Sequence, residues 1–128
     1  MRDQLSNAVF CIVLVVVLIS VLLPNTDIAW MRDHWAWFNR PMLLIESMHS
    51  AVNLVHAILF LLLGMAARIG MPRWRFHKVV LAFLLFGTAT ELVQFMIPGR
   101  HPRISDVLID VIAGVLGWLA VRGLETRQ

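Results

Sequence analysis

Four long apolar runs constrain this chain more than any other feature of its sequence. They cover about residues 8–23, 48–67, 79–97 and 104–121, and few charged side chains interrupt them. A helix needs roughly 20 residues to cross the hydrocarbon core of a membrane, and ~17 can suffice. Helices also satisfy every backbone N–H and C=O group within one segment, as hydrocarbon requires. The sequence therefore predicts an all-α fold, namely a four-helix transmembrane bundle with up-down topology.

The composition agrees with a single membrane domain over residues 1–128. Hydrophobic residues make up 59% of the chain and charged residues only 15%, below the share of charge in a soluble domain. The basic residues lie near the ends of the apolar runs, so they indicate membrane topology and not a nucleic-acid partner. The single cysteine excludes an intramolecular disulfide.

Lysine and arginine are distributed unevenly between the two sides that four spans would create. Both termini and the loop between the second and third runs carry seven of the 11 basic residues. Because short cytoplasmic loops are enriched in these residues, both termini are predicted to be cytoplasmic.

The first outer connection is rich in aromatic residues, with Trp30, Trp35, Trp37 and Phe38 close together. Tryptophan favours the headgroup level, where its ring is half buried and its N–H stays hydrated. We predict an interfacial aromatic segment here, either a turn or a short amphipathic helix, that lies on the outer leaflet. A loop that binds lipid or a protein partner is the alternative.

Polar side chains interrupt the last three runs at similar depths from the outer side. Spacings of three or four residues place them on one face of each helix. They are Asn53 and His56 in the second run, Glu91 and Gln94 in the third, and Asp106 and Asp110 in the fourth. An acid that faced lipid would cost at least ~2.5 kcal/mol near mid-span, so these faces are expected to pack inward. Together with Arg100 in the short last turn, they predict one polar cavity in the outer half of the bundle, a candidate ligand-binding site.

Two glycines of the fourth run share the face of its acids. Gly114 and Gly117 would let the backbone of a neighbouring helix approach closely, so they are predicted to serve helix packing. A homodimer through Ala113 and Gly117 also stays open, because four short helices enclose little volume.

The polar residues of the last two runs form an ordered pattern. It reads Glu91-x-x-Gln94, Pro98-Gly99-Arg100, Ser105-Asp106, Asp110 and Gly114-x-x-Gly117. This pattern resembles that of the VanZ-like family, and Asn53-x-x-His56 is similar to a lysine-x-x-histidine element found there. The resemblance covers about residues 52–119. Asn53 stands where lysine is common and Asp110 where asparagine is common, so any pairing of the family lysine with an acid is absent here.

The resemblance implies a small integral membrane protein of the bacterial inner or plasma membrane. The namesake of the family is linked to low-level resistance to teicoplanin, a glycopeptide with a lipid tail. We therefore expect a protein of the cell envelope that binds or alters a lipid-linked component at the outer leaflet and lowers glycopeptide susceptibility. Its expected partners are membrane lipids and a lipid-linked cell-wall intermediate.

Two other functions stay open, and the sequence leaves undecided whether the protein is an enzyme. An intramembrane enzyme could hydrolyse or transfer a lipid or polyprenyl phosphate, with Glu91 as acid or base and Arg100 and Arg103 holding the phosphate. No nucleophile is evident, because Ser105 is expected to be the N-cap of the fourth helix. The third function is that of a structural or assembly subunit without a ligand site.

Metal ligand types are present, but their spacing matches no recognised metal signature. His49 and His56 lie seven residues apart, or ~10 Å along a helix axis, so one ion would not bind both easily. The sequence therefore predicts neither a metal ion nor a cofactor.

Overall fold

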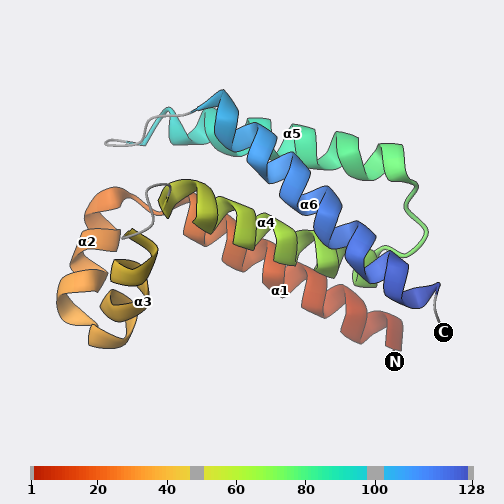
Figure 1. Ribbon diagram of the computed structural model, residues 1–128, viewed down its shortest axis with the longest axis horizontal. Coiled ribbons are helices and arrows are strands. Elements are labelled where there is room, and N and C mark those ends of the chain that lie inside the picture. The colour runs from red at the N-terminus through yellow and green to blue at the C-terminus, as the bar shows by residue number, and fades with distance from the viewer. Residues whose placement is uncertain (1, 47–50, 98–102, 127–128) are drawn as a thin grey trace.

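The computed structural model describes residues 2–46, 51–97 and 103–126, and all regular structure within these ranges is helical. The helices are α1 (Arg2–Leu22), α2 (Asn25–His34), α3 (Ala36–Glu46), α4 (Ala51–Gly70), α5 (Phe76–Gln94) and α6 (Ile104–Glu125). Figure 1 shows the four long helices α1, α4, α5 and α6 running alternately in opposite directions. The predicted all-α class is confirmed. The start of α1 and the end of α6 share one end of the bundle, and we call the opposite end the distal end.

Three of the long helices are long and apolar enough to cross a membrane. They contain Gln4–Leu22 in α1, all of α5 and all of α6. Within α4, Leu54–Gly70 forms a shorter apolar stretch, although α4 packs against both α1 and α6. The predicted count of four spans is therefore not confirmed.

The outward surface of these helices is apolar. On α5, for example, Leu81, Leu85 and Leu92 are each more than half exposed. In water so much contiguous apolar surface would be unfavourable, whereas hydrocarbon solvates it well. The bundle is therefore suited to a lipid environment on its outside, with its polar side chains facing inward.

Glycine lets α4 and α6 approach until their backbones touch. These two helices make the most extensive contact in the described structure. A Cβ atom added to Gly64 would collide with the carbonyl oxygen of Gly114, and one added to Gly117 would collide with that of Leu61. Small residues allow such close crossings between membrane helices. Gly114 also faces the ring of Phe83 on α5, so three helices meet at this residue.

The glycine face of α6 is used within the chain itself. Ala113 is 6% exposed, and Gly117 is buried against α4. A homodimer of this protein would therefore need a different face from the one considered above.

Two short helices occupy the connection in which the sequence predicts one aromatic turn or helix. Figure 1 shows α2 and α3 packed side by side at the distal end. The Trp30 ring stacks on His34 with centroids 4.5 Å apart, and Trp35 stacks on Trp37 at 5.8 Å. Trp30 and Trp37 remain more than half exposed. The aromatic segment is thus an exposed surface at the distal end.

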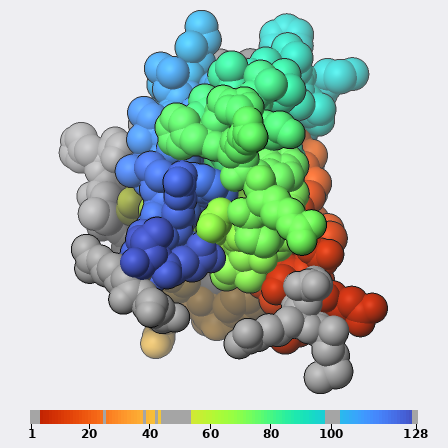
Figure 2. Space-filling model, turned by 90° about the vertical axis from the view of Figure 1, so that its right-hand side faces the viewer, coloured from red at the N-terminus to blue at the C-terminus, as the bar shows by residue number. Residues whose placement is uncertain are grey.

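A buried tryptophan ties α4 to α6 at the end that carries the termini. Trp118 is 1% exposed, and the guanidinium carbons of Arg68 and Arg122 each lie 5.3 Å from its ring centroid. The Arg68 Nε also donates a 2.9 Å hydrogen bond to Glu125 Oε2. Figure 2 views the molecule from this end, where the last turns of α6, in blue, lie beside the green segment that joins α4 to α5. The cations of this end are therefore partly engaged in holding the bundle together.

Replacing Gly117 with alanine should destabilise the protein, whereas the same change at Gly123 should not. The new Cβ atom at position 117 meets the Leu61 carbonyl oxygen, and at position 123 it meets nothing within 4 Å. Overpacking a close contact costs about 1–3 kcal/mol, and alanine at an exposed helix position is favoured over glycine. Thermal unfolding of the detergent-purified variants measures the difference. Equal midpoints for the two variants would contradict the backbone contact between α4 and α6.

Candidate functional site: a carboxylate–histidine cluster

Four ionisable side chains are buried together toward the distal end, and we call them the carboxylate–histidine cluster. His56 lies in the second turn of α4, Glu91 in the last turn of α5, and Asp106 and Asp110 in the first two turns of α6. Their exposed fractions are 4%, 6%, 3% and 0%, respectively. The inward orientation predicted for these residues therefore agrees with their burial, and three helices contribute to one site.

His56 and Asp110 form the bond that joins α4 to α6 within the cluster. The His56 Nδ1 lies 2.9 Å from Asp110 Oδ1. When Asp110 is ionised its carboxylate only accepts hydrogen bonds, so His56 then donates through Nδ1–H and its neutral form keeps the lone pair on Nε2. The other carboxylate oxygen, Asp110 Oδ2, is buried and has no hydrogen-bond partner in the described part of the chain. The pair thus fixes the orientation of the ring and leaves one acceptor unused.

Glu91 connects the end of α5 to the start of α6. Its Oε2 accepts a 2.8 Å hydrogen bond from the backbone N–H of Arg103, the residue immediately before α6. This bond satisfies a donor that the helix itself leaves unpaired. The second oxygen, Glu91 Oε1, is buried and unpartnered among the described residues. One oxygen of Glu91 therefore closes the hairpin, and the other remains available.

The prediction that Ser105 caps α6 is wrong. The helix begins at Ile104 with Arg103 as its N-cap residue, and no side chain makes a capping hydrogen bond there. Ser105 instead donates from its hydroxyl to Asp106 Oδ1 over 3.1 Å. The reason is that α6 starts two residues earlier than a Ser105 cap requires, so the serine lies within the first turn beside the acid.

The remaining predicted site residues have different positions. Gln94 lies three residues beyond Glu91, and its Nε2 donates a 2.9 Å hydrogen bond to the carbonyl oxygen of Val21, so it joins α5 to α1. Asn53 lies in the first turn of α4, but its side chain is outside the described set. Arg100 lies outside the described residues altogether.

Two hydrogen-bond partners in this region could not be predicted from the sequence, because both are backbone groups. The N–H of Arg103 is the partner of Glu91, and the carbonyl of Val21 is the partner of Gln94. Every residue carries such groups, so only the folded geometry identifies the ones that matter. The burial of Thr90 was also not predicted. Its Oγ1 donates a hydrogen bond to the Gly87 carbonyl oxygen within α5.

A family match agrees with the pattern of these residues. The family described as VanZ/LLP1 matches residues 8–125. The chain belongs to the VanZ/LLP1 family. This confirms the resemblance seen in the sequence, and the match also takes in most of α1 and all of α2 and α3, which lie before residues 52–119. No curated protein and no solved structure matches the chain.

Among the residues that the structure describes, the cluster of this VanZ/LLP1 protein holds more acids than bases. Three carboxyl groups face one histidine, so full ionisation would leave an excess of negative charge even with a protonated ring. Arg103 contributes its backbone N–H, and its own side chain is exposed. An uncompensated buried charge is very unfavourable, so among the described groups of the cluster the acids call for protons or a cationic partner.

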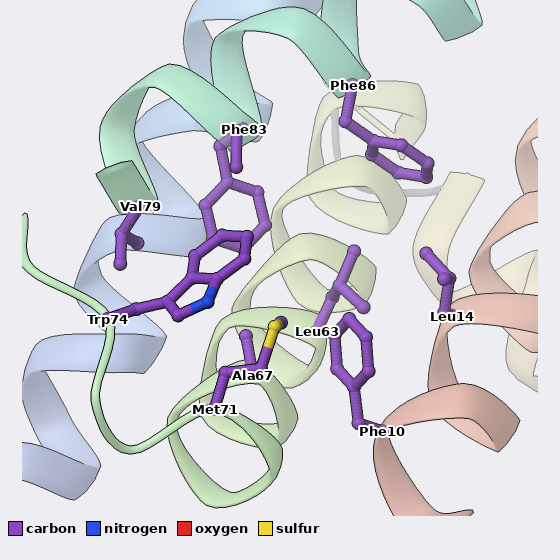
Figure 3. Close-up of a pocket in the computed structure, with 10 residues that line it drawn as sticks. Phe10, Leu14, Leu63, Ala67, Met71, Trp74, Val79, Phe83 and Phe86 are labelled. Carbon is purple, nitrogen blue, oxygen red and sulfur yellow. The ribbon is translucent and has the colours of Figure 1, made fainter. Parts of the chain in front are cut away.

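Two cavities of the VanZ/LLP1 protein lie away from the cluster and are apolar. Figure 3 shows one of about 210 Å³ between α1, α4 and α5, with Phe10, Leu63 and Phe83 among its lining residues. Another, of about 280 Å³, lies between α1 and α4. No member of the carboxylate–histidine cluster lines either cavity. The polar chemistry is therefore concentrated in a packed cluster and not in a roomy apolar pocket.

Replacing Asp110 with leucine in this VanZ/LLP1 protein should lower the thermal midpoint, because His56 loses its buried acceptor. An interhelical hydrogen bond in a membrane contributes about 1–2 kcal/mol in model peptides. Adding His56→Phe to the same chain should restore part of the stability, since no polar ring is then left without a partner. Asp33→Leu, at an exposed position of α2, is the control and should change little. A double variant no more stable than Asp110→Leu would argue against the pairing.

Glu91→Gln should keep the fold of the VanZ/LLP1 protein, whereas Glu91→Leu should not. The amide of glutamine retains a carbonyl oxygen that can accept the Arg103 N–H, and leucine offers no acceptor. An unsatisfied buried donor costs about 1–3 kcal/mol. Membrane abundance and thermal midpoint of both variants test this. If Glu91→Gln were as unstable as Glu91→Leu, the charge of Glu91 would itself be needed for folding.

Proposed function

We propose that this protein acts at the outer leaflet of a bacterial inner or plasma membrane, where it binds or alters the headgroup of a lipid-linked envelope component. The observation that carries the proposal is the carboxylate–histidine cluster, buried toward the end of the bundle that also bears the aromatic helices. The family supports a VanZ-like protein. The ligand and the effect on glycopeptides are our inference.

The position of the cluster supports a headgroup ligand. The exposed tryptophans of α2 and α3 lie at the distal end, and tryptophan favours the headgroup level of a membrane. Glu91 and Asp106 lie in the helix turns that border the same end. A polar group at the membrane surface would therefore be close to these carboxylates.

The chemistry of the cluster supports a headgroup with hydrogen-bond donors. Glu91 Oε1 and Asp110 Oδ2 are buried acceptors without partners in the described structure. A buried acceptor is unfavourable until a donor reaches it. Sugar hydroxyls and ammonium groups are such donors, and lipid-linked envelope components carry them. The site thus favours recognition of the sugar or amine part of a headgroup over its phosphate.

The distribution of basic residues supports the outward orientation of the site. Seven of the 11 lysines and arginines lie near the termini in sequence or between residues 68 and 78, around the α4–α5 connection. Under the positive-inside rule this end faces the cytoplasm, and the distal end faces outward.

An enzyme of lipid phosphates is the second candidate, with Glu91 or Asp106 as acid or base. The observation in its favour is the close approach of two buried acids to a histidine. The Ser105 hydroxyl donates to Asp106 and so has a base beside it. Release of phosphate from a lipid substrate, lost in Glu91→Gln, would favour this candidate over simple binding.

Protection against a lipid-tailed glycopeptide tests the proposed function. Wild type, Glu91→Gln, Asp106→Asn and the control Glu125→Gln are expressed in a susceptible bacterium at equal membrane levels. Wild type and Glu125→Gln should raise the inhibitory concentration of teicoplanin more than that of vancomycin, which lacks the tail. The two cluster variants should lose this protection, because they change the acceptors that face the ligand.

The same strains distinguish between the different ways in which this proposal could be wrong. Well-folded cluster variants that protect as well as wild type would show that the acids serve only the architecture. Absence of protection by every chain would remove the link to glycopeptides. Native mass spectrometry of the purified proteins then asks whether a co-purified lipid differs between wild type and Glu91→Gln, and an identical lipid content would exclude headgroup binding at the cluster.

A further inference from the structure

We infer that the carboxylate–histidine cluster is a binding site for one divalent metal ion, with His56, Glu91 and Asp106 as ligands and Asp110 orienting the histidine. This inference goes beyond the proposed function and does not depend on a lipid ligand. It rests on the geometry of three ligand atoms, on the partner of the histidine ring, and on a buried carboxylate oxygen without a partner among the described residues.

The three ligand atoms already lie close to one another. One atom each from His56, Glu91 and Asp106 lies within 4.8 Å of the other two. Bonds from a metal ion to nitrogen or oxygen are ~2.0–2.2 Å long, which places ligand atoms ~3.4 Å apart in a tetrahedral site. A small inward movement of flexible carboxylates would therefore complete the coordination. All three residues are buried, so the ion would be largely removed from bulk water.

The hydrogen bond of His56 has the form found at protein metal sites. A histidine that binds metal through one ring nitrogen commonly donates its other N–H to a carboxylate, which fixes the tautomer and raises the basicity of the ligand. In this chain Nδ1 is bonded to Asp110, which is fully buried. The nitrogen left to bind a metal is therefore Nε2.

Glu91 is anchored in a similar manner. The backbone N–H of Arg103 donates to Oε2. Glu91 as a residue is 94% buried, and its Oε1 has no hydrogen-bond partner in the described chain. A carboxylate with one oxygen held in place and the other free is well suited to bind an ion. A divalent cation would also offset the excess negative charge of the three acids, which hydrocarbon makes unfavourable.

The ligand types indicate which ions the site would prefer. Imidazole nitrogen together with two carboxylate oxygens suits Zn²⁺, Mn²⁺ and Fe²⁺ better than Ca²⁺, which takes six to eight oxygen ligands. Three protein ligands would leave a coordination position open to water or to a ligand.

Metal binding to the full chain in detergent tests this inference. Protein freed of metal with a chelator is titrated with Mn²⁺ or Zn²⁺ separately, and the bound ion is measured by elemental analysis and calorimetry. Wild type should bind one ion per chain. Glu91→Gln and Asp106→Asn should bind at least ~10-fold more weakly, and Asp110→Asn ~10–100-fold more weakly because it acts through His56.

Two controls separate this site from adventitious binding and from misfolding. His34→Ala and Glu125→Gln change exposed groups outside the cluster and should leave the affinity unchanged. For Mn²⁺ bound to wild type, pulsed electron paramagnetic resonance should detect one directly coordinated imidazole nitrogen, which requires no variant to fold. Added Zn²⁺ should raise the thermal midpoint of wild type but not that of Glu91→Gln.

Three results would overturn the inference. They are wild type that binds neither ion at millimolar concentration, affinity unchanged in the Glu91→Gln/Asp106→Asn double variant, and bound Mn²⁺ without a coordinated nitrogen. Failure of these metal measurements leaves the lipid experiment above unaffected, since protection and co-purified lipid are measured independently.

Discussion

The close contact between α4 and α6 determines where every other part of this bundle lies. Gly64 and Gly117 allow it, since a side chain at either position would collide with the backbone of the opposite helix. The two helices run parallel, so the start of α4 lies beside the start of α6 and His56 reaches Asp110. α1 then packs on α4, and α5 packs on α6. A membrane provides little hydrophobic driving force between helices, so such close packing is a main source of their association.

Three polar bonds near the distal end connect all four long helices. His56 with Asp110 joins α4 to α6, Glu91 with the Arg103 N–H joins α5 to the start of α6, and Gln94 with Val21 joins α5 to α1. These bonds use some of the atoms of the cluster, and within the described residues Glu91 Oε1 and Asp110 Oδ2 have no hydrogen-bond partner. The same acids can therefore support the fold and present acceptors to an ion or a headgroup, and the conservative variants are designed to separate the two roles.

Several features were predictable from the residues alone, and the physical reasons are specific. Long apolar runs can only form helices in hydrocarbon, and the cost of exposing Glu91, Asp106 or Asp110 to lipid required their faces to turn inward. The ordered pattern of these acids also indicated the VanZ family, which the match over residues 8–125 confirms. The Ser105 cap was wrong because α6 begins at Ile104, which places the serine inside the first turn. Aromatic content likewise did not predict that this segment forms two separate helices, α2 and α3.

Periodicity and hydropathy thus decided which residues face inward, but not which inward residues meet. That depended on α4 packing most extensively on α6 and not on α5, the helix that follows it directly in the chain. Sequence spacing describes neighbours on one helix, whereas the proximity of His56, Glu91 and Asp106 arises between three helices. For this reason the ligand spacing along the chain indicated no metal, while the folded arrangement brings one potential ligand atom of each residue within 4.8 Å of the others. Close packing of small residues sets the positions of whole helices, and the site follows from those positions.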